Sequence, residues 1–281
     1  MARKIGVFVL ALAMVGALCG AALAGDTLAE VKKKGVLVAG VKDSLPPFGS
    51  LDPNTKRFTG YDIDFVKYIA TKLGVKVEYK PVTSANRMPM LMESRIDILA
   101  ATMTKTPERA KQIDFSCTYF LTGQKFLTKK GTVKSLKDLE GKRIATAKGS
   151  TSEQNVAKAV PSATVLSLDD YPQGILALQQ GKVTAVTTDE SILSGQLGLL
   201  EKNRATKGKY EIPDIQISME PYGLGMRKGD TSLVKFVNDT LLEMEKNGEA
   251  KKIFVRWFGP NSESPINRGN FMITADKMGL E

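Results

Sequence analysis

Short apolar runs and amphipathic segments alternate along most of the chain. Apolar runs bounded by turn residues, or alternating with polar residues, predict strands at residues 35–41, 75–82, 96–104, 142–149, 164–168 and 183–190. Apolar positions that recur every three or four residues predict helices at residues 61–74, 86–94, 150–160, 171–182 and 231–259. Strands and helices that alternate in this way form βαβ units, in which helices cover both faces of mostly parallel sheets. The pattern therefore predicts an α/β fold.

The first 24 residues have a different pattern from the rest of the chain. Residues 1–4 form a short basic leader, residues 5–18 are apolar and uncharged, and small residues follow up to Ala24. This arrangement is typical of a secretory signal peptide, and the apolar run is shorter than the ~20 residues of a transmembrane anchor. We therefore expect export and cleavage near Ala24. Lipidation at Cys19 stays open, although the residues before it match the usual lipidation box poorly.

The composition of the remaining chain, residues 25–281, favours binding over catalysis. The sequence has no histidine, which excludes a Ser-His-Asp triad, an HExxH zinc site and acid–base catalysis by imidazole. It also lacks the GxxxxGK[ST] loop that holds a nucleotide phosphate. Paired carboxylates stay open as catalytic groups, but Asp and Glu occur throughout the chain. We expect no enzymatic activity, no cofactor and no metal.

Charge and cysteine content exclude further kinds of partner and of structural stabilisation. The formal net charge is +10, but lysine and arginine are scattered through amphipathic segments instead of forming one tract, so we expect no nucleic-acid partner. Beyond the signal peptide Cys117 is the only cysteine, which excludes an internal disulfide. We expect Cys117 to be a small buried apolar residue. The length after residue 24 is enough for two compact lobes.

One predicted strand leads into a helix start that suits an anion. After residues 96–104, Thr106 can cap a helix, Pro107 is tolerated at its first position and Glu108 suits the positive end of its dipole. A helix N-terminus offers unpaired backbone N–H groups to an anion, and Arg109 would add its own charge. The residue pattern predicts an anion-binding position here.

Five segments, in this order and spacing, resemble the extracytoplasmic solute-binding proteins of amino-acid ABC transporters. They are GVKDSLPPF, GYDIDFVKYIATKLG, ATMTKTPERAKQIDFS, KGSTSE and DYPQGILALQQGKVTAVTTDE. The resemblance spans nearly the whole chain after the signal peptide, and five segments in order are far more specific than one. Two further segments, TSANRMPML and NFMITADKMG, are more particularly similar to the glutamate/aspartate-binding branch.

The resemblance implies a two-lobed periplasmic-binding-protein (type II) clamshell, each lobe a mostly parallel sheet flanked by helices. The first lobe would comprise residues 25–122 and 222–281, and the second lobe residues 123–221. The crossings between them would lie near residues 122–124 and 220–223, and the lobes would close on the ligand like a hinged clamp. The protein would be a periplasmic monomer that delivers its ligand to a membrane ABC permease.

The resemblance also implies which residues bind the backbone groups of an amino acid. Arg109 would bind the α-carboxylate, assisted by Thr104 and by Thr151 at a helix start. Asp189 and groups around Thr102 would bind the α-ammonium. In open α/β sheets ligands lie beyond the carboxyl ends of strands, which places Thr102, Thr104 and Arg109 at one such edge and Asp189 at another.

The far end of the ligand would contact a second group of residues. The resemblance brings Lys42, Ser84, Arg87 and Tyr171 to this end, and Phe48 to a wall of the pocket. If Lys42 and Arg87 are both enclosed, this end carries positive charge that no partner compensates. A buried unpaired charge costs ~3–5 kcal/mol, so an acidic side chain would bind best. We therefore expect glutamate or aspartate as the ligand.

Several alternatives stay open at this stage. Arg87 could be a solvated helix residue, Lys42 could form a surface ion pair with Asp43, Ser84 could be a helix cap, and Tyr171 could be a packing residue. Lys42 also stands where relatives can carry arginine, which leaves the choice between glutamate and aspartate open. Another polar amino acid, such as glutamine or asparagine, is the alternative ligand.

Two other classes of protein share this resemblance. The same fold serves a dehydratase of prephenate or arogenate, which would need a positioned acid, and Asp189 is the only candidate. Related clamshells are also fused to kinases and channels as sensors. The sequence shows no further domain or transmembrane helix after the clamshell segments, so we expect no such fusion, and delivery to a separate receptor stays open.

Overall fold

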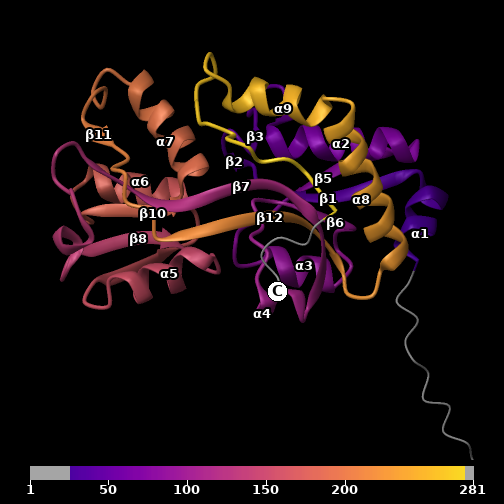
Figure 1. Ribbon diagram of the computed structural model, residues 1–281, viewed down its shortest axis with the longest axis horizontal. Coiled ribbons are helices and arrows are strands. Elements are labelled where there is room, and N and C mark those ends of the chain that lie inside the picture. The colour runs from indigo at the N-terminus through magenta and orange to yellow at the C-terminus, as the bar shows by residue number, and fades with distance from the viewer. Residues whose placement is uncertain (1–25, 276–281) are drawn as a thin grey trace, which may run out of the picture.

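The computed structural model of the protein describes residues 26–275. The predicted signal peptide, the cleavage point near Ala24 and Cys19 lie outside the described residues. Two groups of elements lie at opposite ends of the longest axis, and two long strands run between them (Figure 1). These strands are β7 (Ile113–Lys129) and β12 (Ser218–Arg227). We refer to the group with the N-terminal elements as the first lobe and to the other as the second lobe.

In the first lobe, a central strand pairs in parallel with a neighbour on each side. β1 (Val36–Val41) lies between β5 (Lys76–Pro81) and β6 (Ile98–Ala100). A separate small sheet contains β2 (Ser44–Leu45), β3 (Gly49–Leu51) and β4 (Phe58–Thr59). The helices in this part of the chain are α1 (Thr27–Lys34), α2 (Tyr61–Leu73), α3 (Arg87–Met92) and α4 (Pro107–Ala110). The sequence predicted β1, β5 and β6 together with α2, α3 and the start of α4.

The second lobe repeats the alternation of strand and helix. Its parallel strands are β8 (Arg143–Ala147), β9 (Thr164–Leu168) and β10 (Ala185–Asp189), with β8 in the middle. Its other elements are the 3-10 helix η1 (Leu136–Leu139), α5 (Thr151–Ala159), α6 (Tyr171–Gln179), α7 (Glu190–Lys202) and β11 (Tyr210–Glu211). The strand and helix predictions from β8 to β10 are confirmed. The hydropathy pattern predicted neither α7 nor the long strand β7.

The two lobes share one continuous sheet, whereas the sequence predicted a separate sheet in each. The strand order is β5-β1-β6-β12-β7-β10-β8-β9. β7 and β12 are antiparallel and pair from Ile113 with Arg227 to Gln124 with Ser218. Because β7 is 17 residues long, its first half belongs to the first lobe while its second half pairs with β10 in the second. The pairs of β1 with β5 and β6, and of β8 with β9 and β10, are parallel, as expected of an α/β fold. The pairs β6 with β12, β11 with β7 and those of the small sheet are antiparallel.

The C-terminal helical segment is broken in two. The sequence predicted one helix over residues 231–259, and this prediction is wrong. The structure has α8 (Thr231–Lys246) and α9 (Glu249–Phe258), separated by Gly248 with a φ of 81°. Glycine adopts this left-handed conformation without the steric cost that other residues meet, so the chain turns there. No helix within residues 26–275 is both long and apolar enough to cross a membrane.

The largest apolar core lies in the first lobe and reaches the second. Phe48, Tyr61 and Phe120 pack edge to face at its centre, with ring centroids 5.1 to 5.8 Å apart. Tyr171 and Ile192 of the second lobe belong to the same buried cluster. The two lobes therefore touch each other in this structure. Cys117 is buried in the same core, as the sequence predicted.

Candidate functional site

The candidate site lies where strands end between the two lobes. Lys42 follows β1, Thr102 follows β6, and Asp189 is the last residue of β10. Their side chains are all buried, although each is polar or charged. A Cβ atom at Gly149 of the second lobe would lie 2.8 Å from the Cα atom of Ala85 in the first, so the backbones meet beside these residues.

Arg109 connects the two lobes. Thr106 caps α4 by accepting a hydrogen bond from the Arg109 backbone N–H at 3.2 Å. The guanidinium then donates to the carbonyl oxygens of Thr104 at 2.8 Å and Gly149 at 3.2 Å. Burial, together with the nearby charge of Arg87, lowers the pKa of Arg109 to about 9. Because α4 has only four residues, the positive charge here comes from the guanidinium and not from a helix dipole.

Asp189 keeps one carboxylate oxygen without a partner. The hydroxyl group of Tyr222 donates to Oδ2, while Oδ1 is buried and has no hydrogen-bond partner among the described residues. Burial raises the pKa of Asp189 to about 8, and the nearby carboxylate of Glu220 acts in the same direction. A cationic donor beside Oδ1 would satisfy this oxygen and favour the ionised form of the carboxyl group.

Arg87 is enclosed and holds the backbone after β6. Only 2% of the residue is exposed, so the alternative of a solvated helix residue is wrong. Its guanidinium donates to the carbonyl oxygens of Ala101 at 2.6 Å and Thr102 at 2.9 Å, while Nε has no partner in the described part of the chain. Thr102 has a φ of 50°, a strained conformation for a β-branched residue. Arg87 thus stabilises a strained turn at the edge of the site.

Asp62 supports the same turn, and the sequence analysis missed it. Its Oδ2 accepts from the backbone N–H of Thr102 at 3.1 Å, and its Oδ1 accepts from the hydroxyl group of Tyr119 at 2.6 Å. The residue is fully buried, and burial raises its pKa to about 7. The available signal was an acidic residue beside the apolar face of the helix at residues 61–74. By itself, this signal does not distinguish a site residue from an acid that only stabilises the N-terminus of a helix.

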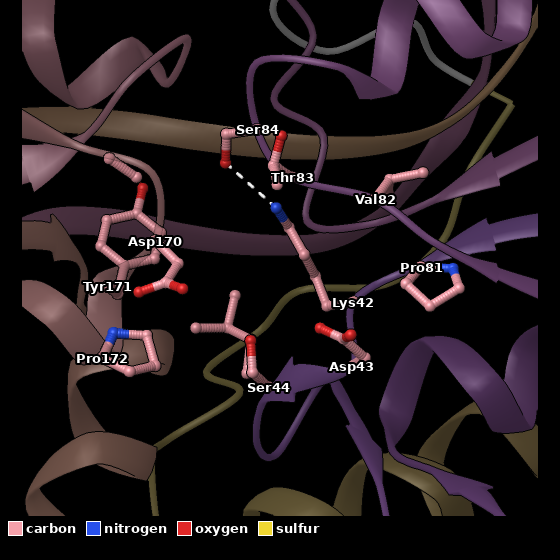
Figure 2. Close-up of a pocket in the computed structure, with 12 residues that line it drawn as sticks. Lys42, Asp43, Ser44, Pro81, Val82, Thr83, Ser84, Asp170, Tyr171 and Pro172 are labelled. Carbon is pink, nitrogen blue, oxygen red and sulfur yellow. Dashed lines mark hydrogen bonds between the residues drawn. The ribbon is translucent and has the colours of Figure 1, made fainter.

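Lys42 lies in a pocket between the lobes. Its ammonium donates to Ser84 Oγ at 3.1 Å, and the pocket has a volume of about 390 Å³ (Figure 2). Burial lowers the pKa of Lys42 well below its ordinary value, and the charge of Arg87 adds to this. Within residues 26–275 Lys42 forms no ion pair with Asp43, so the alternative of a surface ion pair is wrong. Ser84 accepts this hydrogen bond from Lys42. The N-cap residue of α3 is Asn86, so the alternative of Ser84 as a helix cap is wrong.

The second lobe closes this pocket with Asp170 and Tyr171. Asp170 caps α6, because its Oδ1 accepts from the backbone N–H of Gln173 at 3.0 Å. Figure 2 shows the Asp170 carboxylate on the side of the pocket opposite Lys42. Tyr171 is only 5% exposed and both lines the pocket and packs into the core of the first lobe. Asp170 was missed by the sequence analysis, because an acid before Tyr171 and Pro172 is an ordinary helix start.

Phe48 and Thr151 do not line the Lys42 pocket; each contacts a residue that lies near Asp189. Phe48 is fully buried, and its ring centroid is 5.6 Å from that of Tyr222, the residue that bonds Asp189. Thr151 donates its hydroxyl proton to Glu220 at 2.9 Å, and Asn155 donates to the same carboxylate at 2.8 Å. Glu220 was predicted only as part of a crossing. Its side chain is buried, and its charge acts on Asp189.

These acids change the charge balance that the sequence implied. The sequence analysis paired Arg109 with Asp189 and left Lys42 and Arg87 without negative partners. The structure adds buried Asp62 and Glu220, and it places Asp43 and Asp170 around the Lys42 pocket. The premise of uncompensated positive charge is therefore wrong. Asp43 is adjacent to Lys42, and the other acids come from segments far from Lys42 in the sequence.

The fold, with an enclosed polar pocket between its lobes, is that of the two-lobed periplasmic binding proteins. Comparison with known families agrees. The model of the bacterial extracellular solute-binding proteins, family 3, matches residues 37–260, and the chain belongs to this family. Such proteins bind a solute and catalyse no reaction, so the dehydratase alternative is not supported.

Individual relatives differ in their ligands. The chain is 38% identical over 237 residues to the ABC transporter glutamine-binding protein GlnH of Bacillus subtilis, covering 83% of this chain and 84% of that protein. It is 34% identical over 272 residues to a glutamate/aspartate import solute-binding protein of Salmonella typhimurium, covering 92% and 88%. An ancestral arginine-binding protein bound to glutamine has a TM-score of 0.74 and 41% identity, over 80% of this chain and 98% of that one.

Proposed function

We propose that this protein binds L-glutamine between its lobes and delivers it to an ABC-transporter permease. The observation that carries the proposal is the charge balance of the pocket around Lys42. A cation from the first lobe and a carboxylate from the second, Asp170, lie on opposite sides of this pocket. A side-chain amide has one acceptor and one donor end, so it can satisfy both groups at once.

The polar groups of the pocket match the two ends of an amide. The amide oxygen accepts from Lys42 Nζ and Ser84 Oγ, which already lie 3.1 Å apart. The amide nitrogen donates to Asp170, whose Oδ1 is engaged by Gln173 while its Oδ2 is in no hydrogen bond within the described chain. A ligand carboxylate would instead meet the like charges of Asp170 and Asp43, which disfavours binding. The glutamine-binding relative supports the same ligand.

The ligand's backbone groups bind at the other end of the site. Arg109 donates to the α-carboxylate, because a guanidinium offers two parallel donors to a carboxylate. Asp189 Oδ1 accepts from the α-ammonium, which supplies the partner that this buried oxygen otherwise lacks in the described chain. These assignments follow the family resemblance. The burial of Asp189 and the position of the half-buried Arg109 at the contact between the lobes support them.

Closure and delivery follow from the arrangement of the lobes. We place the hinge in β7 and β12, between lobes of residues 25–122 with 222–281 and residues 123–221. The pairing of Thr122 with Glu220 in these two strands supports this position. Ligand contacts from both lobes stabilise the closed form over the open one. The monomeric protein acts in the periplasm after its signal peptide is cleaved near Ala24.

Glutamate or aspartate is the second candidate ligand. The favouring observations are the buried ammonium of Lys42 and the glutamate/aspartate-binding relative, which covers 92% of this chain. Aspartate is one methylene shorter than glutamate, so it would leave its carboxylate farther from Lys42.

Calorimetric titration of residues 25–281, unfolded and refolded to remove bound ligand, tests the proposal. Glutamine, glutamate, aspartate, asparagine and arginine are titrated in parallel. We expect glutamine to bind at least ~10-fold more tightly than glutamate, because a charge-assisted hydrogen bond contributes ~1.5–3 kcal/mol. Tighter binding of glutamate would replace glutamine by the second candidate. Binding of none of the five would overturn the proposed function.

A further inference from the structure

Helix α7 connects the site to a contact between the lobes. Asp189 is the residue immediately before α7 and holds its N-cap position. Two glycines, Gly195 and Gly198, follow within the helix, where each costs ~1 kcal/mol relative to alanine. They are three residues apart and therefore lie on the same face of the helix. Because both glycines lower the stability of the helix and lie on one face, we expect a close contact on that face that excludes a side chain.

The first glycine lies against the loop that follows β2. A Cβ atom at Gly195 would overlap the carbonyl oxygen of Pro46 and would lie 2.7 Å from Cδ of Pro47. Real Cβ atoms essentially never approach other heavy atoms within 3.0 Å. Pro46 and Pro47 belong to the first lobe, while α7 belongs to the second. The absence of a side chain at Gly195 therefore allows a backbone contact between the lobes.

The second glycine lies against the segment that follows α9. A Cβ atom at Gly198 would overlap the carbonyl oxygen of Glu263. This segment, residues 259–266, is held on the first lobe by a hydrogen bond from the Ile266 N–H to the Phe258 carbonyl oxygen at 3.1 Å. In Figure 1 the chain after α9 runs toward α7. The side chains of Lys202 and Glu263 also form an ion pair across this contact.

We propose that the glycine face of α7 (Gly195 and Gly198) is a docking face that forms only when the lobes close, and that it positions Asp189 for the ligand. The inference rests on the clamp-like function proposed above but not on which amino acid is bound. Both partners of the face move with the first lobe, whereas α7 moves with the second. Neither glycine lines the Lys42 pocket, so the face acts on the ligand only through closure and through Asp189.

The energetic role follows from linkage between closure and binding. The apparent affinity of a ligand that needs the closed state scales with the fraction of protein that can close. An alanine at either position would meet a backbone carbonyl group, which cannot rotate away as a flexible side chain can. Closure would then stop short, and Asp189 would be displaced from the position that the ligand requires. Substitution at this face should therefore weaken binding without unfolding the open protein.

The test compares Gly198→Ala and Gly195→Ala with Gly174→Ala. Gly174 lies in α6 of the second lobe, where a Cβ atom would have its nearest neighbour, Val186, at 3.4 Å, so this variant is a matched control. Each variant is titrated with L-glutamine, or with whichever of the five amino acids the wild type binds. We expect at least ~10-fold weaker binding for Gly198→Ala and Gly195→Ala and less than ~2-fold for the control. The melting temperature of the ligand-free protein should not fall.

A second measurement works without any ligand. A zero-length carbodiimide reagent joins an amine to a carboxylate that touches it, and mass spectrometry detects the Lys202–Glu263 cross-link. We expect this cross-link in the wild type, more of it with ligand, and a loss of most of it in Gly198→Ala. Wild-type affinity and cross-linking in the glycine variants would overturn the docking face. If the wild type binds none of the amino acids but forms the cross-link, the proposed ligand fails and the docking face stands.

Discussion

The guanidinium of Arg109 in the first lobe donates a hydrogen bond to the carbonyl oxygen of Gly149 in the second lobe, at 3.2 Å. The same side chain donates to the carbonyl oxygen of Thr104 at 2.8 Å. One cation thus contacts both halves of the clamp at the place where the α-carboxylate of an amino acid is proposed to bind. In the proposed function, Arg109 therefore couples ligand capture to closure.

Replacement of Arg109 should affect every amino acid alike. We expect Arg109→Ala to weaken binding at least ~10-fold for any ligand, because a hydrogen bond to a charged group contributes ~1.5–3 kcal/mol. Arg109→Lys keeps the charge but loses the two parallel donors, so it should fall between the wild type and alanine. Calorimetry measures both. Near wild-type binding by Arg109→Ala would remove this residue from the proposed site.

Replacement of Asp170 should change which ligand side chain the protein prefers. Asp170→Asn removes the negative charge opposite Lys42 but retains an oxygen that can cap α6, since Asn and Asp are equally good at this position. We expect the ratio of glutamate to glutamine affinity to rise at least ~10-fold, with little change in melting temperature. Parallel titrations with the two ligands measure the ratio. An unchanged ratio would mean that Asp170 does not contact the ligand side chain.

Replacement of Arg87 should weaken all ligands to a similar degree. The guanidinium bonds the backbone carbonyl groups of Ala101 and Thr102, so Arg87→Met leaves two buried acceptors without these donors and frees a strained turn. An unpaired buried acceptor costs ~1–3 kcal/mol, so we expect a lower melting temperature as well. Lys42→Met is the comparison, because it should weaken glutamate more than glutamine. If Arg87→Met discriminated against glutamate alone, Arg87 would contact the ligand side chain directly.

Ligand binding should release protons near neutral pH. Burial raises the pKa of Asp189 to about 8, so the carboxyl group of the ligand-free closed site is largely protonated at pH 7. The ligand ammonium favours the ionised carboxylate, so binding expels the proton, and affinity should rise as the pH increases toward 8. Titrations at pH 7 in phosphate and in Tris, whose ionisation heats differ, measure the release. Asp189→Asn should bind more weakly and lose most of this release.

The same shift makes the ligand-free closed form less stable at higher pH. A carboxyl group whose folded pKa is raised binds more protons in the folded state than in the unfolded state. Its unfavourable contribution is absent below the unfolded pKa of about 4 and grows as the pH rises toward 8. Asp62, with a pKa raised to about 7, adds to this trend. Melting temperatures measured between pH 4 and pH 8 should therefore fall less for Asp189→Asn than for the wild type.

The local pattern of the sequence determined most of the elements around the site. β1, β5, β6, α2 and the run from β8 to β10 were predictable because each has its own hydrophobic period and its own end signals, such as Gly74 after α2. The break between α8 and α9 was not recognised, because the amphipathic pattern continues across Gly248. β7 and α7 were missed as well. β7 is shared between the two lobes, and α7 belongs to the second lobe but contacts the first.

The sequence also indicated candidate site residues. Arg109 follows one predicted strand and Asp189 lies at the end of another, whereas Lys42 and Arg87 were implied by the family resemblance alone. Only the tertiary structure decided the charge balance among them. Asp62, Asp170 and Glu220 approach these cations from helix starts and a hinge strand tens of residues away. Coulombic energy depends on distance and burial, which a linear pattern does not contain. For that reason, the sequence alone favoured an acidic ligand, whereas the charge balance of the folded pocket is the ground on which we propose an amide.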